Sequence, residues 1–223
     1  MLKKLLDLIF PPRSDEAALR EVCDDDFLAL MAPRLAPETR PGTAVLLPFN
    51  APIVRAAIHE AKYHGSQRAF SLLALALADY LRGLDDIRTA RSGLKDSDSR
   101  SNLVVLVPIP LGKKRRKERG YNQTEEVARR ALRGFSEEGL PISIDPSLLV
   151  RVRETESQVA LPREKREENM RGAFGAASAV DPSCIYLLID DVLTTGATLQ
   201  AAIDALRATG VPPERILPIA LAH

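Results

Sequence analysis

Residues 185–200 read IYLLIDDVLTTGATLQ. The continuous apolar run at 185–189 is typical of a strand that is covered on both faces. Asp190 and Asp191 end this run, a loop of threonine and glycine follows, and the residues from 197 to 208 have helical periodicity. A strand, a tight loop and a helix in this order indicate an α/β protein with a parallel sheet, which binds its ligands beyond the carboxyl ends of the strands.

The same alternation of strands and helices extends in both directions along the chain. Two further apolar runs, at 103–107 and 216–221, predict buried strands. Weaker strand signals lie at 148–152 and at 45–47, where an edge strand is expected. Helices are expected at 14–31, 50–63, 67–82, 124–134 and 163–170, with Ser14, Asn50 and Thr124 as the caps of three of them. The order of elements predicts a parallel sheet with right-handed crossovers and flanking helices.

Composition excludes several classes of protein. Of the 223 residues, 45% are hydrophobic and 27% charged, which is near the average for a soluble globular chain. The net charge of +1 argues against a dedicated basic nucleic-acid binder, although a local basic patch is compatible with it. No apolar run approaches the roughly 18 residues that span a bilayer, so no transmembrane segment is expected. The two cysteines, Cys23 and Cys184, are too few for a tetrahedral zinc site, and a reducing, cytoplasmic location is expected.

The loop after residues 185–189 has the chemistry of a phosphate site. Backbone N–H groups at the start of the following helix attract an anion, and Gly196 lets the backbone approach it closely. Further donors are the hydroxyl groups of Thr194, Thr195 and Thr198. Asp190 and Asp191, at the end of the strand, can accept hydrogen bonds from the vicinal hydroxyls of a sugar. Together these features predict a ribose 5-phosphate ligand.

This segment resembles the phosphoribosyl pyrophosphate motif of the type I phosphoribosyltransferases, and further motifs resemble the ComF family within that superfamily. These motifs are AKYHG at 61–65, VPIPL at 107–111, RGYNQ at 119–123, QVAL at 158–161, the stretch 163–166 and NMRGAF at 169–174. The likeness covers residues 1–13 and 50–223. The chain departs from the family's pattern at the four-cysteine zinc finger, because Ser14 stands where the first cysteine would be expected. No zinc is therefore expected.

The resemblance implies a type I phosphoribosyltransferase-like sheet flanked by helices, with a small N-terminal helical or hood region. We expect two parts, a helical segment at 1–49 in place of the zinc finger and a phosphoribosyltransferase-like domain at 50–223. The expected ligand is phosphoribosyl pyrophosphate, or another ribose 5-phosphate, bound with Mg²⁺. Its expected contacts are Asp190, Asp191, Thr194, Thr195, Gly196, Ala197 and Thr198, together with Pro108, Ile109 and Pro110 of a pyrophosphate loop.

The resemblance also implies the remaining roles. Asp190 and Asp191 are expected to support Mg²⁺ indirectly. Lys113 begins a basic run, 113–119, which either neutralises the departing pyrophosphate or is a solvated loop. Arg119 and Tyr121 belong to a segment resembling the loop that closes over the substrate, and these two residues and Lys113 are the candidate catalytic residues. His59 and His64 either contact the acceptor or are ordinary surface residues.

Three functions remain open from the sequence. The first is transfer of the phosphoribosyl group to an unidentified acceptor. The second is a non-catalytic module for competence, DNA uptake or recombination, which binds single-stranded DNA or a DNA-uptake protein; it requires basic residues that continue outward from 113–117. The third is a regulator that senses the nucleotide precursor. The helix expected at 67–82 packs either inside the chain or against a second copy, so a homo-oligomer is also open.

Overall fold

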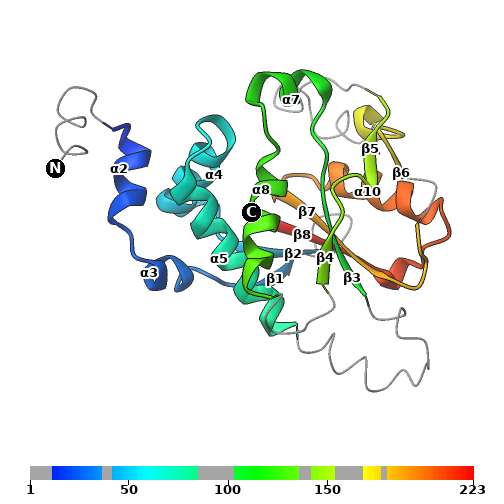
Figure 1. Cartoon of the computed structure of the whole chain (residues 1–223), viewed down its shortest axis with the longest axis horizontal. Helices are drawn as coiled ribbons and strands as arrows, with labels where there is room; N and C mark the ends of the chain where they lie inside the picture. The colour runs from blue at the N-terminus through cyan, green and yellow to red at the C-terminus, as the bar shows by residue number, and fades with distance from the viewer. Residues whose placement is uncertain (1–11, 37–41, 85–102, 136–141, 154–167, 177–179) are drawn as a thin grey trace.

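The computed structural model describes residues 12–36, 42–84, 103–135, 142–153, 168–176 and 180–223. A six-stranded sheet in the order β1-β2-β8-β7-β3-β4 forms its centre (Figure 1). The strands are β1 (Arg34–Ala36), β2 (Thr43–Leu47), β3 (Val104–Pro108), β4 (Ile142–Ile144), β7 (Ile185–Val192) and β8 (Ile216–Ala222). All neighbours pair in parallel except β1, which is antiparallel to β2. The predicted α/β fold with a mostly parallel sheet and flanking helices is confirmed.

Helices cover one face of the sheet, and a helix and a small hairpin cover the other. The first face carries α4 (Pro52–Tyr63), α5 (Gln67–Gly83) and α8 (Gln123–Ala131), and the second carries α10 (Ala197–Arg207) with the antiparallel pair β5 (Leu149–Arg151) and β6 (Phe174–Ala176). Side chains of β7 alternate between them: Leu187 and Ile189 join the first core, Tyr186 and Leu188 the second. Because both faces are covered, the central strands appear in the sequence as unbroken apolar runs.

The N-terminal part forms two short helices, α2 (Ser14–Glu21) and α3 (Asp24–Leu28), so the single helix expected at 14–31 is wrong. Val22 has extended backbone angles and interrupts the helix. Cys23 then caps α3, because its Sγ accepts a hydrogen bond from the N–H of Asp26 at 3.3 Å. The capping role expected for Ser14 is also wrong, since Arg13 occupies that position.

Three further local expectations are corrected. The strand at 45–47 is not at the edge: β2 lies between β1 and β8, and all of its residues are buried. β1 and β2, which both precede residue 50, pair into the main sheet. Ala51 rather than Asn50 precedes α4, and Asn122 rather than Thr124 caps α8. Most of the helix expected at 163–170 falls outside the described residues.

The remaining described elements are α7 (Lys113–Arg119) and the short 3-10 helices η1 (Leu132–Gly134) and η3 (Pro213–Arg215). The basic run at 113–119 is thus a helix rather than a loop, and none of its side chains is buried. Of the helices within the described ranges, none has both the length and the hydropathy that crossing a bilayer requires.

Candidate functional site

The loop between β7 and α10 lies at the carboxyl edge of the sheet, where the sequence predicts it. Gly196 holds the N-cap position of α10 with φ of +80°. This left-handed backbone conformation is costly for residues with a Cβ atom, so the turn depends on glycine. The hydroxyl of Thr195 accepts a weak hydrogen bond of 3.4 Å from the N–H of Ala197. Thr194 is exposed, whereas Thr195 and Ala197 are buried, so Thr194 is the more accessible of the two adjacent hydroxyls.

The turn at 108–110 lies directly beside the end of β7. Pro108 pairs with Ile189 in the sheet register, and the N–H of Ile109 donates to the carbonyl of Ile189 at 2.9 Å. Asn122, at the start of α8, also holds this turn, because its side-chain amide donates a hydrogen bond to the carbonyl of Ile109 at 3.0 Å. The structure therefore brings the expected pyrophosphate turn next to Asp190 and Asp191.

The two adjacent carboxylates have different surroundings. By the alternation along β7, Asp191 faces α4 and α8, and Asp190 faces the side of α10. One oxygen of Asp191 lies 3.0 Å from Nζ of Lys62, and the other accepts a hydrogen bond from the side-chain amide of Gln123. Asp190 accepts a hydrogen bond of 2.9 Å from the N–H of Asp191. Burial, followed by the charge of Asp191, raises the pKa of Asp190 to about 7.

The segment 119–123 forms the corner between α7 and α8, and it contacts the motif at 61–65. Arg119 donates to the amide oxygen of Gln123 at 2.9 Å, and its guanidinium carbon lies 5.1 Å from the ring centre of Tyr63. The hydroxyl of Tyr121 donates to the carbonyl of Ala61 at 2.8 Å. Two sequence motifs about sixty residues apart thus make one surface beside Asp191.

The three candidate catalytic residues therefore have different surroundings. Arg119 reaches Asp191 through Gln123. Tyr121 directs its hydroxyl to Ala61, and burial raises the pKa of this hydroxyl. Lys113 lies exposed at the first position of α7. Sequence reasoning gave no role to Lys62 or Gln123: both lie in the quoted motifs, but only the fold brings them to the same carboxylate.

The carboxylates near the loop fit a bound Mg²⁺ unequally. Carboxylate oxygens are the usual protein ligands of this ion. Asp191 already pairs with the ammonium of Lys62 and with the amide of Gln123, whereas the hydrogen bond to Asp190 comes from a backbone N–H, so a cation there would replace no side-chain hydrogen bond among the described residues. The donor set therefore suits a cation held by Asp190, directly or through water.

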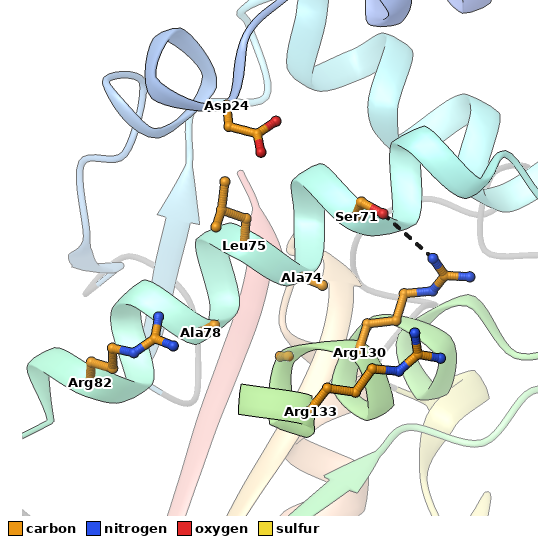
Figure 2. A pocket seen from close by; sticks show the side chains of 9 residues that line it. Asp24, Ser71, Ala74, Leu75, Ala78, Arg82, Arg130 and Arg133 are labelled. Atoms are coloured by element: carbon orange, nitrogen blue, oxygen red, sulfur yellow. Dashed lines mark hydrogen bonds between the residues drawn. The ribbon is translucent and has the colours of Figure 1, made fainter. Parts of the chain in front are cut away.

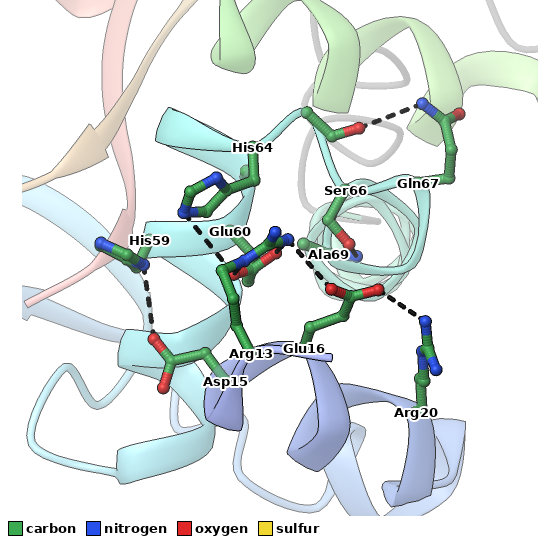
Figure 3. A network of polar contacts seen from close by, with 12 residues as sticks. Arg13, Asp15, Glu16, Arg20, His59, Glu60, His64, Ser66, Gln67 and Ala69 are labelled. Carbon is green, nitrogen blue, oxygen red and sulfur yellow. Dashed lines mark hydrogen bonds and ion pairs between the residues drawn. The ribbon is translucent and has the colours of Figure 1, made fainter. Parts of the chain in front are cut away.

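A second polar cluster lies at the end of α4 (Figure 3). His59, Glu60 and His64 bring potential metal-ligand atoms within 4.8 Å of one another. Both oxygens of Glu60, however, accept hydrogen bonds from Arg13, at 2.8 and 2.7 Å. Since a metal ion here would have to displace this guanidinium, the cluster fits a structural ion-pair network better than a metal site. Its effect is to fasten the start of α2 to α4.

Part of the chain is similar in sequence to a known protein. No family model matches the chain. The chain is similar to Competence protein F of Haemophilus influenzae (strain ATCC 51907 / DSM 11121 / KW20 / Rd), with 31% identity over 120 residues. The match covers 53% of this chain and 50% of that protein, so the chain spans about half the length of the curated relative. This similarity supports the ComF-family assignment that the motifs predict.

Proposed function

We propose that the protein binds phosphoribosyl pyrophosphate, or another ribose 5-phosphate, at the loop between β7 and α10. The observation that supports this most strongly is the glycine turn at Gly196, which opens a helix directly after Asp190 and Asp191. Backbone N–H groups from Thr194 to Thr198, at the positive end of α10, provide the donors that a 5-phosphate requires. The neighbouring turn at 108–110 is available for the pyrophosphate.

Transfer of the phosphoribosyl group to an unidentified acceptor is the reaction that this site would perform. The bond between ribose C1 and pyrophosphate breaks through a transition state with oxocarbenium character, so the departing negative charge must be neutralised. Bound Mg²⁺ would supply part of that charge and would be held at Asp190. Arg119 and Lys113 are the cations of this chain assigned to the leaving group, and Tyr121 holds the corner that would exclude water.

Isothermal titration with phosphoribosyl pyrophosphate, with and without Mg²⁺, tests the site. Binding should depend on Mg²⁺, and Asp190→Asn/Asp191→Asn should weaken it at least about tenfold, or about 1.4 kcal/mol. Asp204→Asn is a matched control, because Asp204 is an exposed carboxylate on α10. Equal affinity in the double variant and the wild-type protein would exclude a role of the acids in binding.

A non-catalytic role in DNA uptake is the second candidate, and the name of the relative, Competence protein F, favours it. The wholly unburied basic helix α7 also favours it. Beyond the corner, arginines line a hollow of about 300 Å³ between α5 and α8 (Figure 2): Arg82, Arg130 and Arg133. Asp24 also lines this hollow, and the three arginines add to the cations of α7, which would favour DNA binding because phosphate contacts dominate such binding.

Fluorescence anisotropy with labelled single-stranded DNA at several salt concentrations tests this second function. Affinity should fall with salt, and replacement of Lys113, Lys114, Arg115 and Arg116 by serine should weaken binding and reduce the salt dependence. Arg207→Ser, an exposed arginine on α10, is the control. If no DNA binding is observed at low salt, the protein does not bind DNA itself, and its partner in DNA uptake would be another protein.

Either function is compatible with the cytoplasmic location that we propose. Cys23 and Cys184 are both free thiols. Free thiols are the usual state in the reducing environment of the cytosol.

A further inference from the structure

We infer that the outward side of α5 is the contact surface of a homodimer, in which acids of one copy meet arginines of the other. This surface, the α3–α5 face, consists of the hollow between α5 and α8 and of the acids of α3 beside it (Figure 2). The inference does not depend on the proposed ligand site, because that site contacts the start of α8 whereas the hollow lies at its end.

α5 has an inner and an outer side. The inner side fills the core, where Leu72, Leu73 and Leu77 are buried. The outer side carries residues at helical spacing that line the hollow of about 300 Å³: Ser71, Ala74, Leu75 and Ala78. The alanines keep the floor of the hollow low, and Leu75, its largest apolar side chain, is only half-buried. An apolar floor with a polar rim is the composition of a protein interface.

The rim of this hollow is cationic. Arg82, Arg130 and Arg133 line it, and two of them lie against aromatic rings. The guanidinium carbon of Arg82 is 5.0 Å from the ring centre of Phe135, and that of Arg130 is 5.2 Å from the ring centre of Phe70. Such stacking orders an arginine before a partner arrives and so reduces the entropy lost on binding. Arg133 is exposed and forms no salt bridge with a carboxylate of the described residues.

The other edge of the same face is acidic. Asp24, Asp25 and Asp26 are consecutive in α3, and all three are exposed. Asp24 lines the hollow and pairs with Arg68 at 2.6 Å. Within the described residues, neither Asp25 nor Asp26 has a salt bridge. Phe27 follows them and is buried in the core, so these acids are carried by an element with a fixed position.

The arrangement of these charges favours a second copy of the chain as the partner. α5 passes between Asp24 and Arg133, so acids and arginines lie on opposite sides of the apolar floor (Figure 2). In a two-fold contact, each residue pair occurs twice with the copies exchanged. α3 of each copy then faces the arginines of the other. A polyanion such as DNA, or an unrelated acidic protein, would reach the arginines but would meet like charges at α3.

The strength of the contact follows from its composition. Charge pairs at an exposed rim contribute little each and are screened by salt, so the dimer should be weak and salt-sensitive. Its formation would cover the arginines of the hollow and leave α7 as the basic surface accessible to DNA.

Sedimentation equilibrium of the full chain at several salt concentrations tests the inference with two charge-reversed variants. Asp25→Lys/Asp26→Lys and Arg130→Glu/Arg133→Glu should each weaken self-association at least about tenfold, because like charges then face each other. An equimolar mixture of the two variants should associate at least as tightly as the wild-type protein, since both contacts of the mixed dimer pair opposite charges. The controls Asp204→Lys and Arg207→Glu, at exposed positions of α10, should leave association unchanged.

Three results would overturn the inference. The first is a wild-type chain that remains monomeric at low salt up to about 1 mM, the dissociation constant of a very weak complex. The second is wild-type self-association that neither variant weakens, since the contact would then lie elsewhere. The third is a mixture that associates no more tightly than its separate components. If Arg130→Glu/Arg133→Glu does not fold, Arg133→Glu takes its place, because Arg133 is exposed.

Discussion

The contact between Arg13 and Glu60 offers the sharpest test of how the N-terminal segment is held. The Glu60 side chain is completely buried, and both of its oxygens accept hydrogen bonds from Arg13, whose own side chain is 49% exposed. Arg13→Met removes the guanidinium but keeps much of the apolar stem. The buried carboxylate then retains the imidazole of His64, whose Nε2 lies 3.9 Å from one of its oxygens.

The expected loss of stability follows from this half-exposed geometry. Removing one partner of a fully buried ion pair costs about 3–5 kcal/mol, whereas an exposed pair contributes about 0–1 kcal/mol. Because water reaches Arg13 but not Glu60, we expect the free energy of unfolding to fall by about 2–3 kcal/mol. For a chain of this length, such a loss lowers the melting temperature by about 5–10 °C.

The loss should also depend on pH. The hydrogen bond from Arg13, and secondarily its charge, holds the pKa of Glu60 below its ordinary value. A carboxyl group with a lowered folded-state pKa stabilises the fold above its unfolded pKa, and this contribution disappears as the pH falls through the folded value. The difference between wild type and Arg13→Met should therefore be complete at neutral pH and shrink progressively below pH 4.5, the ordinary value for Glu60.

Urea denaturation followed by circular dichroism measures this difference at each pH. Arg129→Met is a matched control: Arg129 is also 49% exposed, and it pairs with Glu125 on the surface of α8 at 3.0 Å. That variant should lose about 0.3–0.5 kcal/mol. If Arg13→Met costs no more than the control, the ion pair does not hold α2 to α4.

Two other predictions concern single residues. Gly65→Ala should lower the free energy of unfolding by about 1 kcal/mol, because Gly65 has φ of +60° and an added Cβ would lie 3.4 Å from the Tyr121 ring. Chemical denaturation checks this, and Gly83→Ala, where a Cβ meets nothing within 4 Å, should cause no comparable loss. With a thiol reagent, exposed Cys23 should react in the native protein, whereas Cys184, buried and with its thiol pKa raised by burial, should react only on unfolding. Rapid reaction of both thiols would contradict the described core.

The fold was predictable from the sequence where burial alone decides it. The runs that form β3, β7 and β8 are apolar on both faces because helices or a hairpin cover both sides of the sheet. Local capping was less predictable. The break between α2 and α3 has no glycine or proline to announce it, and a cysteine serves as the cap. The central position of β2 depends on β8, far along the chain, so no local pattern reveals it.

In the candidate site, too, the features that are contiguous in sequence were predictable, whereas the contacts between distant parts of the chain were not. The strand, the two acids and the glycine turn are contiguous in sequence, so the loop between β7 and α10 could be located from the motif. The different surroundings of Asp190 and Asp191 could not, because they depend on Lys62 from α4 and Gln123 from α8. A sequence motif supplies the residue types of a site, and the fold determines which of them are already paired.

The place of β8 in the sheet has a consequence for the order in which the protein is assembled during synthesis. β2 leaves the ribosome early, but its parallel neighbour is β8, which is also the neighbour of β7. The N-terminal strands cannot join the rest of the sheet until residues 216–222 have been translated. Nascent chains that lack this strand therefore expose the apolar edges of β2 and β7, and holding these edges apart from other chains is a task for molecular chaperones.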